Sequence, residues 1–163
     1  MNDPRPVQVG PITIAPVRKS IHVHTGQARA FEVFTEGLGR WWPKHSNNRP
    51  APIQTVVLEP EVGGHWYEVY EDGSRTMVGT ILTWDPPHRF VMSWEYTCVW
   101  KSDPGIGSEV EVRFIAEGEH ATLVELEHRL FERMGLEGGT KTRESVNGGW
   151  PLMLDLFKAE AER

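Results

Sequence analysis

The sequence predicts an α+β fold, in which a long carboxy-terminal helix lies across one face of an antiparallel sheet. Six runs rich in β-branched and aromatic residues follow one another over residues 54–129, and turn signals separate them. Helical periodicity precedes these runs and returns after them. A series of strands with helices at its ends is typical of an α+β domain, because consecutive strands then pair with each other.

Length and composition indicate one domain without a polyanionic partner. The 163 residues are 39% apolar, which is enough for a single hydrophobic core. The formal net charge is -6, and acidic and basic residues are interspersed along the chain. We therefore expect neither nucleic acid nor an anionic membrane as a partner. The single cysteine, Cys98, cannot form an internal disulfide, which favours a reducing compartment.

Residues 1–16 are predicted to form an extended arm, and residues 17–163 to form a single domain. The arm contains four prolines and shows little periodicity. It lacks the basic start and the long apolar stretch of a signal peptide, and no later segment is apolar enough to span a membrane. The expected location is the cytoplasm.

The first elements are predicted to be a strand, a helix and a short second helix. Residues 17–24 alternate as in a strand, and Thr25 can cap the helix that follows. That helix is expected to extend through Glu36 and to end at the glycines after it. A short helix or turn at 40–43 and a loop at 47–52 lead to the sheet.

Six strands are then predicted to form a meander with one apolar face and one charged face. Alternation along the strands assigns the two faces. The expected strand ranges are 54–59, 65–71, 76–84, 89–96, 108–116 and 122–129. The expected inward rows are Phe90, Met92, Trp94 and Tyr96, then Val110, Val112 and Phe114, then Thr122, Val124, Leu126 and His128.

The carboxy-terminal part is predicted to be a glycine-rich loop at 135–139 and a long amphipathic helix at 141–162. Gly148 and Gly149, followed by Pro151, predict a kink or a weak turn in this helix, because proline removes a backbone donor. The apolar stripe of the helix comprises Val146, Trp150, Met153, Leu154, Phe157 and Ala161.

Several short motifs occur in the order that is found in one protein family. They are Gly63-Gly64 before a strand, Asp72-Gly73 in a turn, Gly79 in a strand, residues 84–89 (WDPPHR) at a hairpin, Trp94, and Trp150-Pro151 in the last helix. In these motifs, residues 17–163 resemble homologues of the heat-shock protein 90 ATPase activator, a family of the SRPBCC superfamily. This superfamily also includes START lipid-transfer domains, polyketide cyclases and the birch pollen allergen.

The resemblance implies a helix-grip fold. In this fold a curved antiparallel sheet wraps around the long carboxy-terminal helix, and the cavity between them often takes an apolar ligand. The resemblance does not imply a shared reaction, because members of the superfamily bind, transfer or cyclise very different molecules. Nor does the family name establish chaperone work.

The stretch EVGGHWYE, residues 61–68, places two glycines before an aromatic strand. Glycines at this point allow a bulge or a sharp bend, and such curvature lets a sheet wrap a helix and leave a space beneath it. If Trp66 and Glu68 face that space, Glu68 is a polar anchor for a ligand. Alternation equally allows the other face, which begins with His65, to point inward.

The predicted ligand-binding residues lie on the inward rows, on the short second helix and on the final helix. Plain core packing is the alternative for each of the tryptophans of the short helix, and a hydrogen-bonded core position is the alternative for His128. The full set is Trp41, Trp42, Trp66, Glu68, Met92, Trp94, Tyr96, Phe114, His128, Trp150 and Leu154. Glu68 and His128, with Tyr96, are also the candidates for proton transfer.

No metal and no cofactor are expected. His22 and His24 share a strand face but have no third ligand at metal spacing, and Cys98 has no His or Lys arranged to lower its pKa. Gly63-Gly64 lacks the lysine and the helix of a phosphate-binding loop, and no serine lies in a nucleophile elbow.

Three functions are compatible with the sequence. The leading hypothesis is a non-catalytic protein that binds a small hydrophobic or amphipathic molecule between the sheet and the final helix. The second is a cyclase- or hydrolase-type enzyme in which Glu68 and His128 move protons in the same cavity. The third is a chaperone-accessory interaction module whose interior is filled by side chains. A homodimer is left open for all three.

Overall fold

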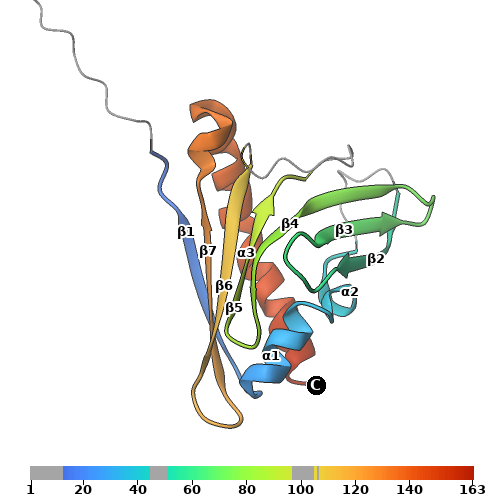
Figure 1. The fold of residues 1–163 in the computed structure, drawn as a ribbon, viewed down its shortest axis with the longest axis vertical. Coiled ribbons are helices and arrows are strands. Elements are labelled where there is room, and N and C mark those ends of the chain that lie inside the picture. Colours follow the sequence, from blue (N-terminus) through green and yellow to red (C-terminus); the bar gives the residue numbers. More distant parts are fainter. Residues whose placement is uncertain (1–12, 45–50, 97–104, 106) are drawn as a thin grey trace, which may run out of the picture.

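Seven strands form one antiparallel sheet in the computed structural model, which describes residues 13–44, 51–96, 105 and 107–163. Strands β2 to β7 follow one another in chain order and β1 pairs with β7, so that β1 and β2 are the edges (Figure 1). The strands are β1 (Val17–Val23), β2 (Ile53–Leu58), β3 (His65–Tyr70), β4 (Arg75–Asp85), β5 (Arg89–Trp94), β6 (Ser108–Ala116) and β7 (Thr122–Arg129). The described helices are α1 (Gln27–Phe34), α2 (Leu38–Trp41), the 3₁₀ helix η1 (Phe131–Met134) and α3 (Leu136–Ala161).

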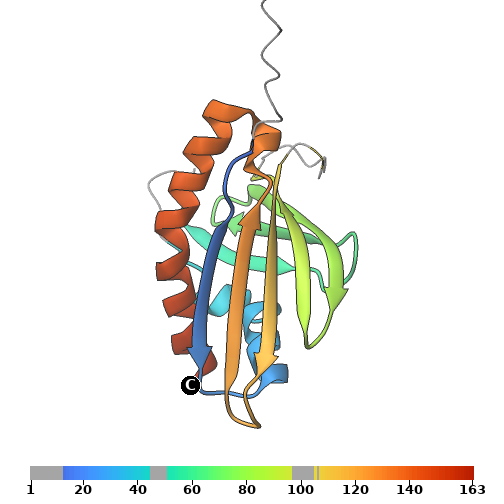
Figure 2. The ribbon, with the colours of Figure 1, turned by 90° about the vertical axis from the view of Figure 1, so that its left-hand side faces the viewer.

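The sheet bends sharply across its width. β1, β7 and β6 run along α3, whereas β4 curves away and leads into β3 and β2, which cross at a steep angle (Figures 1 and 2). Register shifts, which mark bulges and increase local twist, lie at Ile53/Thr55, Trp66/Tyr67 and Ile81/Thr83. The other three strand pairs keep a continuous register. The curvature therefore belongs to β2–β5, and the sheet wrapped around α3 confirms the α+β, helix-grip type of fold.

The glycine pair of EVGGHWYE forms the tight turn before β3. Gly63 has a φ of 83°, in the left-handed region that favours glycine. A Cβ on the next residue, Gly64, would lie 2.4 Å from the carbonyl oxygen of Glu59. The register shift at Trp66/Tyr67 follows two residues later. The predicted bend at this point is confirmed.

Alternation assigned the faces of β6 and β7 correctly. The concave face of the sheet packs against α1, α2 and α3 and forms the hydrophobic core. On α3, the buried residues that meet this face are Trp150, Leu154, Phe157 and Ala161. On β6 and β7, the inward rows are Val110, Val112 and Phe114, and Thr122, Val124, Leu126 and His128, and each of these residues is at most 2% exposed.

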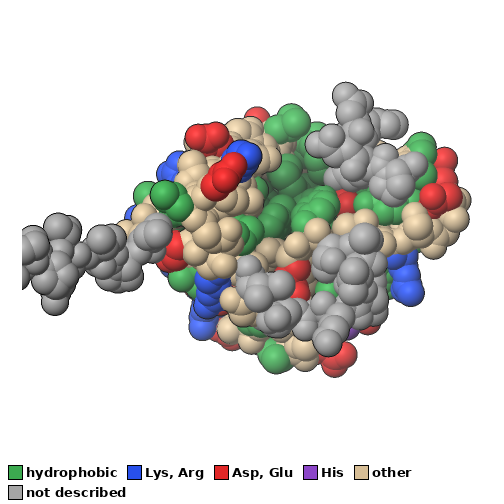
Figure 3. Space-filling model, turned by 90° about the horizontal axis from the view of Figure 1, so that it is seen from above, with side chains coloured by type: hydrophobic (Ala, Val, Ile, Leu, Met, Phe, Trp, Pro, Cys, Tyr) green, Lys and Arg blue, Asp and Glu red, His purple; other side chains and the backbone are tan. Residues whose placement is uncertain are grey.

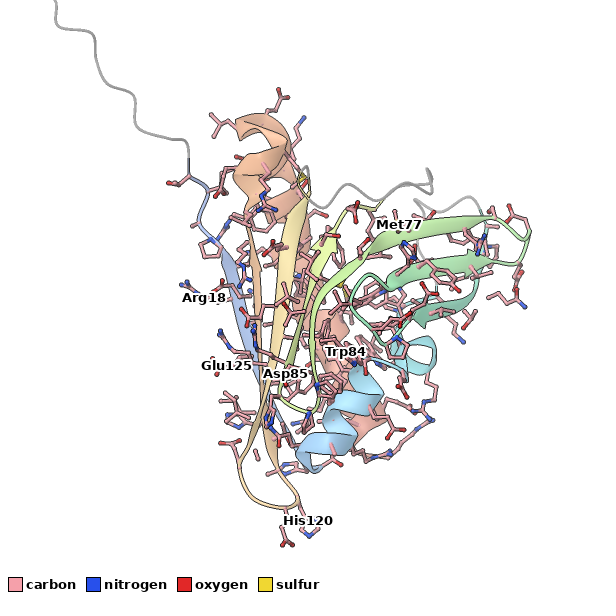
Figure 4. All side chains as sticks on the ribbon, in the orientation of Figure 1. Arg18, Met77, Trp84, Asp85, His120 and Glu125 are labelled. Atoms are coloured by element: carbon pink, nitrogen blue, oxygen red, sulfur yellow. The ribbon has the colours of Figure 1, made fainter. Side chains whose placement is uncertain are left out.

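The convex face of β5, β6 and β7 carries a network of arginines and glutamates. Glu111 is the most buried of these carboxylates, and Arg129, Arg89 and Arg113 approach it at 2.6, 3.1 and 3.8 Å. Burial alone would raise the pKa of Glu111, but the hydrogen bonds from Arg129 and Arg89 outweigh it and hold the pKa below its ordinary value. Arg18 and Glu125, on β1 and β7, point outward from the same sheet (Figure 4). The predicted charged face is therefore a layer of paired charges.

Two predicted boundaries of the first helices are wrong. Thr25 does not cap α1; the cap position is Gly26, and it makes no side-chain capping bond. The first helix ends at Phe34, before Glu36, because Thr35 leaves the helical conformation and turns its hydroxyl to the Phe31 carbonyl at 2.7 Å. Of the two glycines expected to end it, the second, Gly39, already lies inside α2.

The final helix starts earlier than predicted. Residues 135–139 are not a loop, because α3 begins at Leu136 and η1 precedes it. Gly139 is buried within the first turn region of α3 and fits closely against η1, where a Cβ would lie 2.2 Å from the carbonyl oxygen of Phe131. α3 continues through Pro151 to Ala161 as one helix.

α3 also covers the outer edge of β1. Arg143 Nε donates to the carbonyl of Ala15, two residues before β1, at 2.6 Å, and Lys158 Nζ donates to the His22 carbonyl in β1 at 2.8 Å. Figure 2 shows α3 alongside this strand. Edge carbonyls that are already paired offer less to a strand of another chain.

Some predictions lie outside the described residues. These are most of the arm at 1–16, most of the loop at 47–52, and Cys98. Tyr96, expected on a strand, follows β5, which ends at Trp94. Of the helices in the described ranges, none is both long and apolar enough to cross a membrane.

Candidate functional site

A cavity of about 550 Å³ opens between α3 and the sheet. Its volume lies in the range of small-molecule sites, about 300–1,000 Å³. Seen from above, the molecule shows a hollow with hydrophobic side chains on its floor, close to the first half of α3 (Figure 3). The described lining residues are Trp42, Pro43, Trp94, Tyr96, Lys141, Thr142, Ser145, Val146, Gly149, Trp150 and Met153.

One wall of the cavity is aromatic. The ring of Trp94 lies at its centre, with centroid distances of 5.4 Å to Trp150, 5.5 Å to Tyr96 and 6.5 Å to Trp42. Each of these three ring planes is tilted by 46–56° to the plane of Trp94. Tilted aromatic clusters of this kind leave ring faces and edges available for a further flat ring. Four predicted ligand-binding residues thus meet at one surface.

The opposite wall is one face of α3. The residues follow the spacing of three and four that places side chains on the same side of a helix. Thr142 and Ser145 contribute hydroxyl groups, Val146 and Met153 contribute apolar surface, and Gly149 contributes backbone. Near the start of this face, Lys141 Nζ lies 3.1 Å from Glu137 and remains largely exposed. The cavity is therefore amphipathic, with its polar groups on α3.

A buried carboxylate holds the Trp42 ring in place. Trp42 Nε1 donates to Glu68 Oε2 at 2.9 Å, and the Tyr70 hydroxyl donates to Glu68 Oε1 at 3.0 Å. Trp66, Glu68 and Tyr70 are all at most 1% exposed, so the alternative that placed His65 inward is wrong. Glu68 lies behind Trp42 and does not line the cavity. It anchors an aromatic side chain of the wall.

A buried histidine holds the Trp150 ring in the same way. Trp150 Nε1 donates to His128 Nδ1 at 3.1 Å, and His128 Nε2 lies 2.7 Å from Ser108 Oγ. Burial lowers the pKa of His128 to about 3, so the ring is neutral at pH 7. Because Nδ1 accepts from Trp150, the single ring proton is assigned to Nε2, which donates to Ser108. Both ring nitrogens are therefore engaged within the core.

The predicted proton-transfer set does not meet at one point in the cavity. Of Glu68, His128 and Tyr96, the structure places only Tyr96 on the lining. His128 packs against Trp94 with a centroid distance of 5.2 Å and stacks on Phe131 at 4.7 Å. Glu68 and His128 each engage an indole N–H of the wall instead.

Tyr96 lies on the cavity lining in an unusual backbone conformation. Its φ is 48°, in the left-handed region, and its side chain is 41% exposed. Its backbone N–H donates to the Val78 carbonyl at 3.0 Å, a carbonyl that the N–H of Glu95 also reaches at 2.7 Å. Non-glycine residues adopt this conformation infrequently, and they concentrate at functional sites.

The remaining predicted ligand-binding residues are core residues. Trp66 packs behind Trp42 with a centroid distance of 5.1 Å, and Phe114 contacts Phe31 and Phe34. Five of the predicted ligand-binding residues are buried in the core and do not line the cavity, namely Trp41, Trp66, Met92, Phe114 and Leu154.

Sequence reasoning missed most of the α3 wall. Thr142, Ser145 and Gly149 line the cavity but belong to no apolar stripe, so hydrophobic periodicity did not select them. Their signal is positional, since steps of four, four and three residues lead from Met153 to Gly149, Ser145 and Thr142 toward the start of the helix. Within the described residues, no three His, Cys, Asp or Glu side chains gather as metal ligands.

Two solved structures resemble this chain in sequence as well as in fold. The anthrahydroquino-γ-pyrone synthase Txn09, complexed with SUM, is 37% identical, with 90% of this chain and 97% of that chain covered and a TM-score of 0.65. The self-sacrificing resistance protein CalC from Micromonospora echinospora is 33% identical, with coverages of 90% and 93% and a TM-score of 0.64. A search of curated proteins gives no match.

The fold is shared more widely. The Aha1 dimer from Colwellia psychrerythraea is 14% identical and has a TM-score of 0.64, with 91% of this chain and 97% of that chain covered. At this identity the likeness concerns the fold alone, so a homodimer of the present chain stays a prediction. The profile of the family described as "Activator of Hsp90 ATPase homolog 1-like protein" matches residues 24–162. Together with the relatives at 33% and 37% identity, this match shows that the chain belongs to that family.

Proposed function

We propose that this protein binds a planar aromatic small molecule in the cavity between α3 and the sheet. The observation that carries the proposal is the aromatic wall of Trp42, Trp94, Tyr96 and Trp150 around a space of about 550 Å³. Flat rings pair with such side chains in stacked or edge-to-face contacts, each of which adds about 0.5–1.5 kcal/mol beyond area burial. The hydroxyl groups on α3 suit polar substituents at the edge of the ligand.

The fixed position of the wall supports the proposal. The indole groups of Trp42 and Trp150 are held by buried acceptors, Glu68 and His128. A site whose side chains are already ordered loses less conformational entropy on binding. The anchoring satisfies both indole N–H groups within the protein. The wall therefore offers an apolar, aromatic surface.

One of the two relatives supports the same class of ligand. The synthase at 37% identity is named for a product that contains an anthrahydroquinone, a fused aromatic ring system. The relative at 33% identity is a resistance protein. Binding without turnover is the function that we infer for the present chain, because Glu68 and His128, the main candidates for proton transfer, bond to the indole N–H groups of Trp42 and Trp150 and do not line the cavity.

A fluorescence titration with a dihydroxyanthraquinone tests the proposal. We expect saturable quenching of tryptophan fluorescence, because Trp94 and Trp150 touch the bound ring. Trp94→Leu should weaken binding by about tenfold, since it removes an aromatic contact while keeping apolar burial. Trp84→Leu is the matched control, because Trp84 lies outside the cavity lining and packs on Phe31. Absence of saturable binding by the wild-type protein would refute the proposal.

Catalysed ring closure is a second candidate function. The observation in its favour is the 37% identity to a synthase over nearly the whole chain. Here a hydroxyl oxygen of the ligand would add to a carbonyl carbon of the same molecule, and its proton would pass to the carbonyl oxygen. To distinguish catalysis from simple binding, a hydroxyl-bearing linear polyketide is incubated with native or boiled protein, and the products are analysed by chromatography. Conversion of the polyketide only in the presence of native protein would show that the protein catalyses ring closure rather than only binding the ligand.

A further inference from the structure

The glycines of α3 are present for different reasons. Each costs about 1 kcal/mol relative to alanine in a helix interior, because glycine has more backbone freedom to lose. Gly139 is buried, and a Cβ there would lie 2.2 Å from the Phe131 carbonyl oxygen and 2.7 Å from Ile14 Cδ1. Packing of α3 against η1 therefore requires this glycine.

No such requirement exists for Gly148 and Gly149. Apart from the chain neighbours and the local backbone of α3 itself, a Cβ at either position would meet no atom of the described residues within 4 Å. Both residues lie in the middle of α3, and neither has a positive φ. Close packing within the protein therefore does not account for a glycine at either site.

The two positions differ in what surrounds them. Gly149 is half-buried and lines the cavity, whereas Gly148 is exposed and does not line it. The open space at Gly149 is thus part of the cavity. A side chain at this position would tilt toward the start of the helix and cover the surface near Ser145 and Val146, which also line the cavity.

We propose that Gly149 determines the size of ligand that the cavity admits. Its missing side chain lets a fused ring system lie against the backbone of α3, opposite the aromatic wall, and keeps the Ser145 hydroxyl uncovered. This inference rests on the proposed function, and it names a specificity-determining residue for it. A ligand with two rings needs less of this space than a ligand with three.

Isothermal titration calorimetry with naphthol and with a dihydroxyanthraquinone tests the inference on four proteins. These are the wild type, Gly148→Ala, Gly149→Ala and Gly149→Leu. Both alanine variants should melt at a higher temperature, because alanine favours the helix at both sites. Gly148→Ala should bind both compounds like the wild type. Gly149→Ala should weaken the anthraquinone several-fold more than naphthol, and Gly149→Leu should weaken the anthraquinone by about tenfold or more.

The outcomes separate this inference from the proposed function. Wild-type binding together with unchanged binding by Gly149→Leu would overturn the role of Gly149 and leave the cavity function standing. Equal weakening by Gly148→Ala and Gly149→Ala would also overturn it, because helix flexibility would then be the cause. If the wild type binds neither compound, the proposed function fails, and the role of Gly149 fails with it.

Discussion

The two buried acceptors, Glu68 and His128, show how polar groups can serve an apolar cavity. Each receives an indole N–H, from Trp42 and from Trp150, and each is shielded from solvent. An indole N–H buried without an acceptor would cost about 1–3 kcal/mol, so the acceptors allow both tryptophans to be buried. His128 can accept from Trp150 only while Nδ1 is unprotonated. The protonation state of this histidine therefore enters both the stability of the fold and the position of the wall.

We predict that this histidine makes the fold sensitive to mild acid. Burial lowers the pKa of His128 to about 3 in the folded protein, whereas its ordinary value, which applies to the unfolded chain, is 6.5. Below pH 6.5 the unfolded chain therefore binds a proton that the folded chain does not, and stability falls as the pH falls toward 3. Between pH 7 and pH 5 the expected loss is on the order of 2 kcal/mol. Urea denaturation at pH 7, 6 and 5 measures it.

The control for this prediction is His128→Gln. The amide keeps a donor and an acceptor but does not titrate. This variant should therefore lose less stability than the wild type between pH 7 and pH 5, although it should be less stable than the wild type at pH 7. Parallel losses in the two proteins would assign the acid sensitivity to other groups.

α3 performs several tasks along its length. Its first half forms the polar wall of the cavity, Arg143 bonds to a carbonyl just before β1, and Lys158 bonds to a carbonyl of β1. Its buried stripe meets the concave face of the sheet, where Phe157 packs on Phe34 at 4.9 Å and on Trp41 at 5.7 Å. The helix is therefore both part of the core and part of the site, and the fold depends on its apolar face.

We expect Phe157→Asp to prevent folding, whereas Leu152→Asp should be tolerated. Phe157 is fully buried, and an unpaired carboxylate there would cost several kcal/mol. Leu152 lies on the same helix but is 61% exposed, so its replacement by Asp keeps the charge in water. Circular dichroism melting curves of both variants measure the difference. A cooperative Phe157→Asp transition at the wild-type temperature would contradict the packing of α3 described above.

Much of the architecture could be predicted because the local patterns agree with the final environment. Alternation in β6 and β7 identified Val112, Leu126 and His128 as inward, and the structure buries all three. The start of α3 could not be predicted in the same way. Gly139 suggests a loop from its type, whereas its close approach to the Phe131 carbonyl and to the Ile14 side chain explains a glycine inside a helix.

The site was harder to predict than the fold, because periodicity assigns a direction and not a depth. Trp42 and Trp66 both point inward, and their rings lie 5.1 Å apart, but only Trp42 reaches the cavity surface. Likewise, Glu68 and His128 face the interior as expected, yet each is engaged by a tryptophan of the wall. Whether an inward residue reaches the cavity depends on how several elements pack together. The sequence of a single strand does not contain that information.

A crystal structure of the protein with a bound dihydroxyanthraquinone tests the account most directly. The expected result places the fused rings between Trp94, Trp150 and the backbone of Gly149, with a polar edge toward Ser145. Glu68 and His128 should keep their bonds to Trp42 and Trp150 and should not touch the ligand. Density for the ligand outside this cavity, or direct contact of the ligand with Glu68 or His128, would contradict the account.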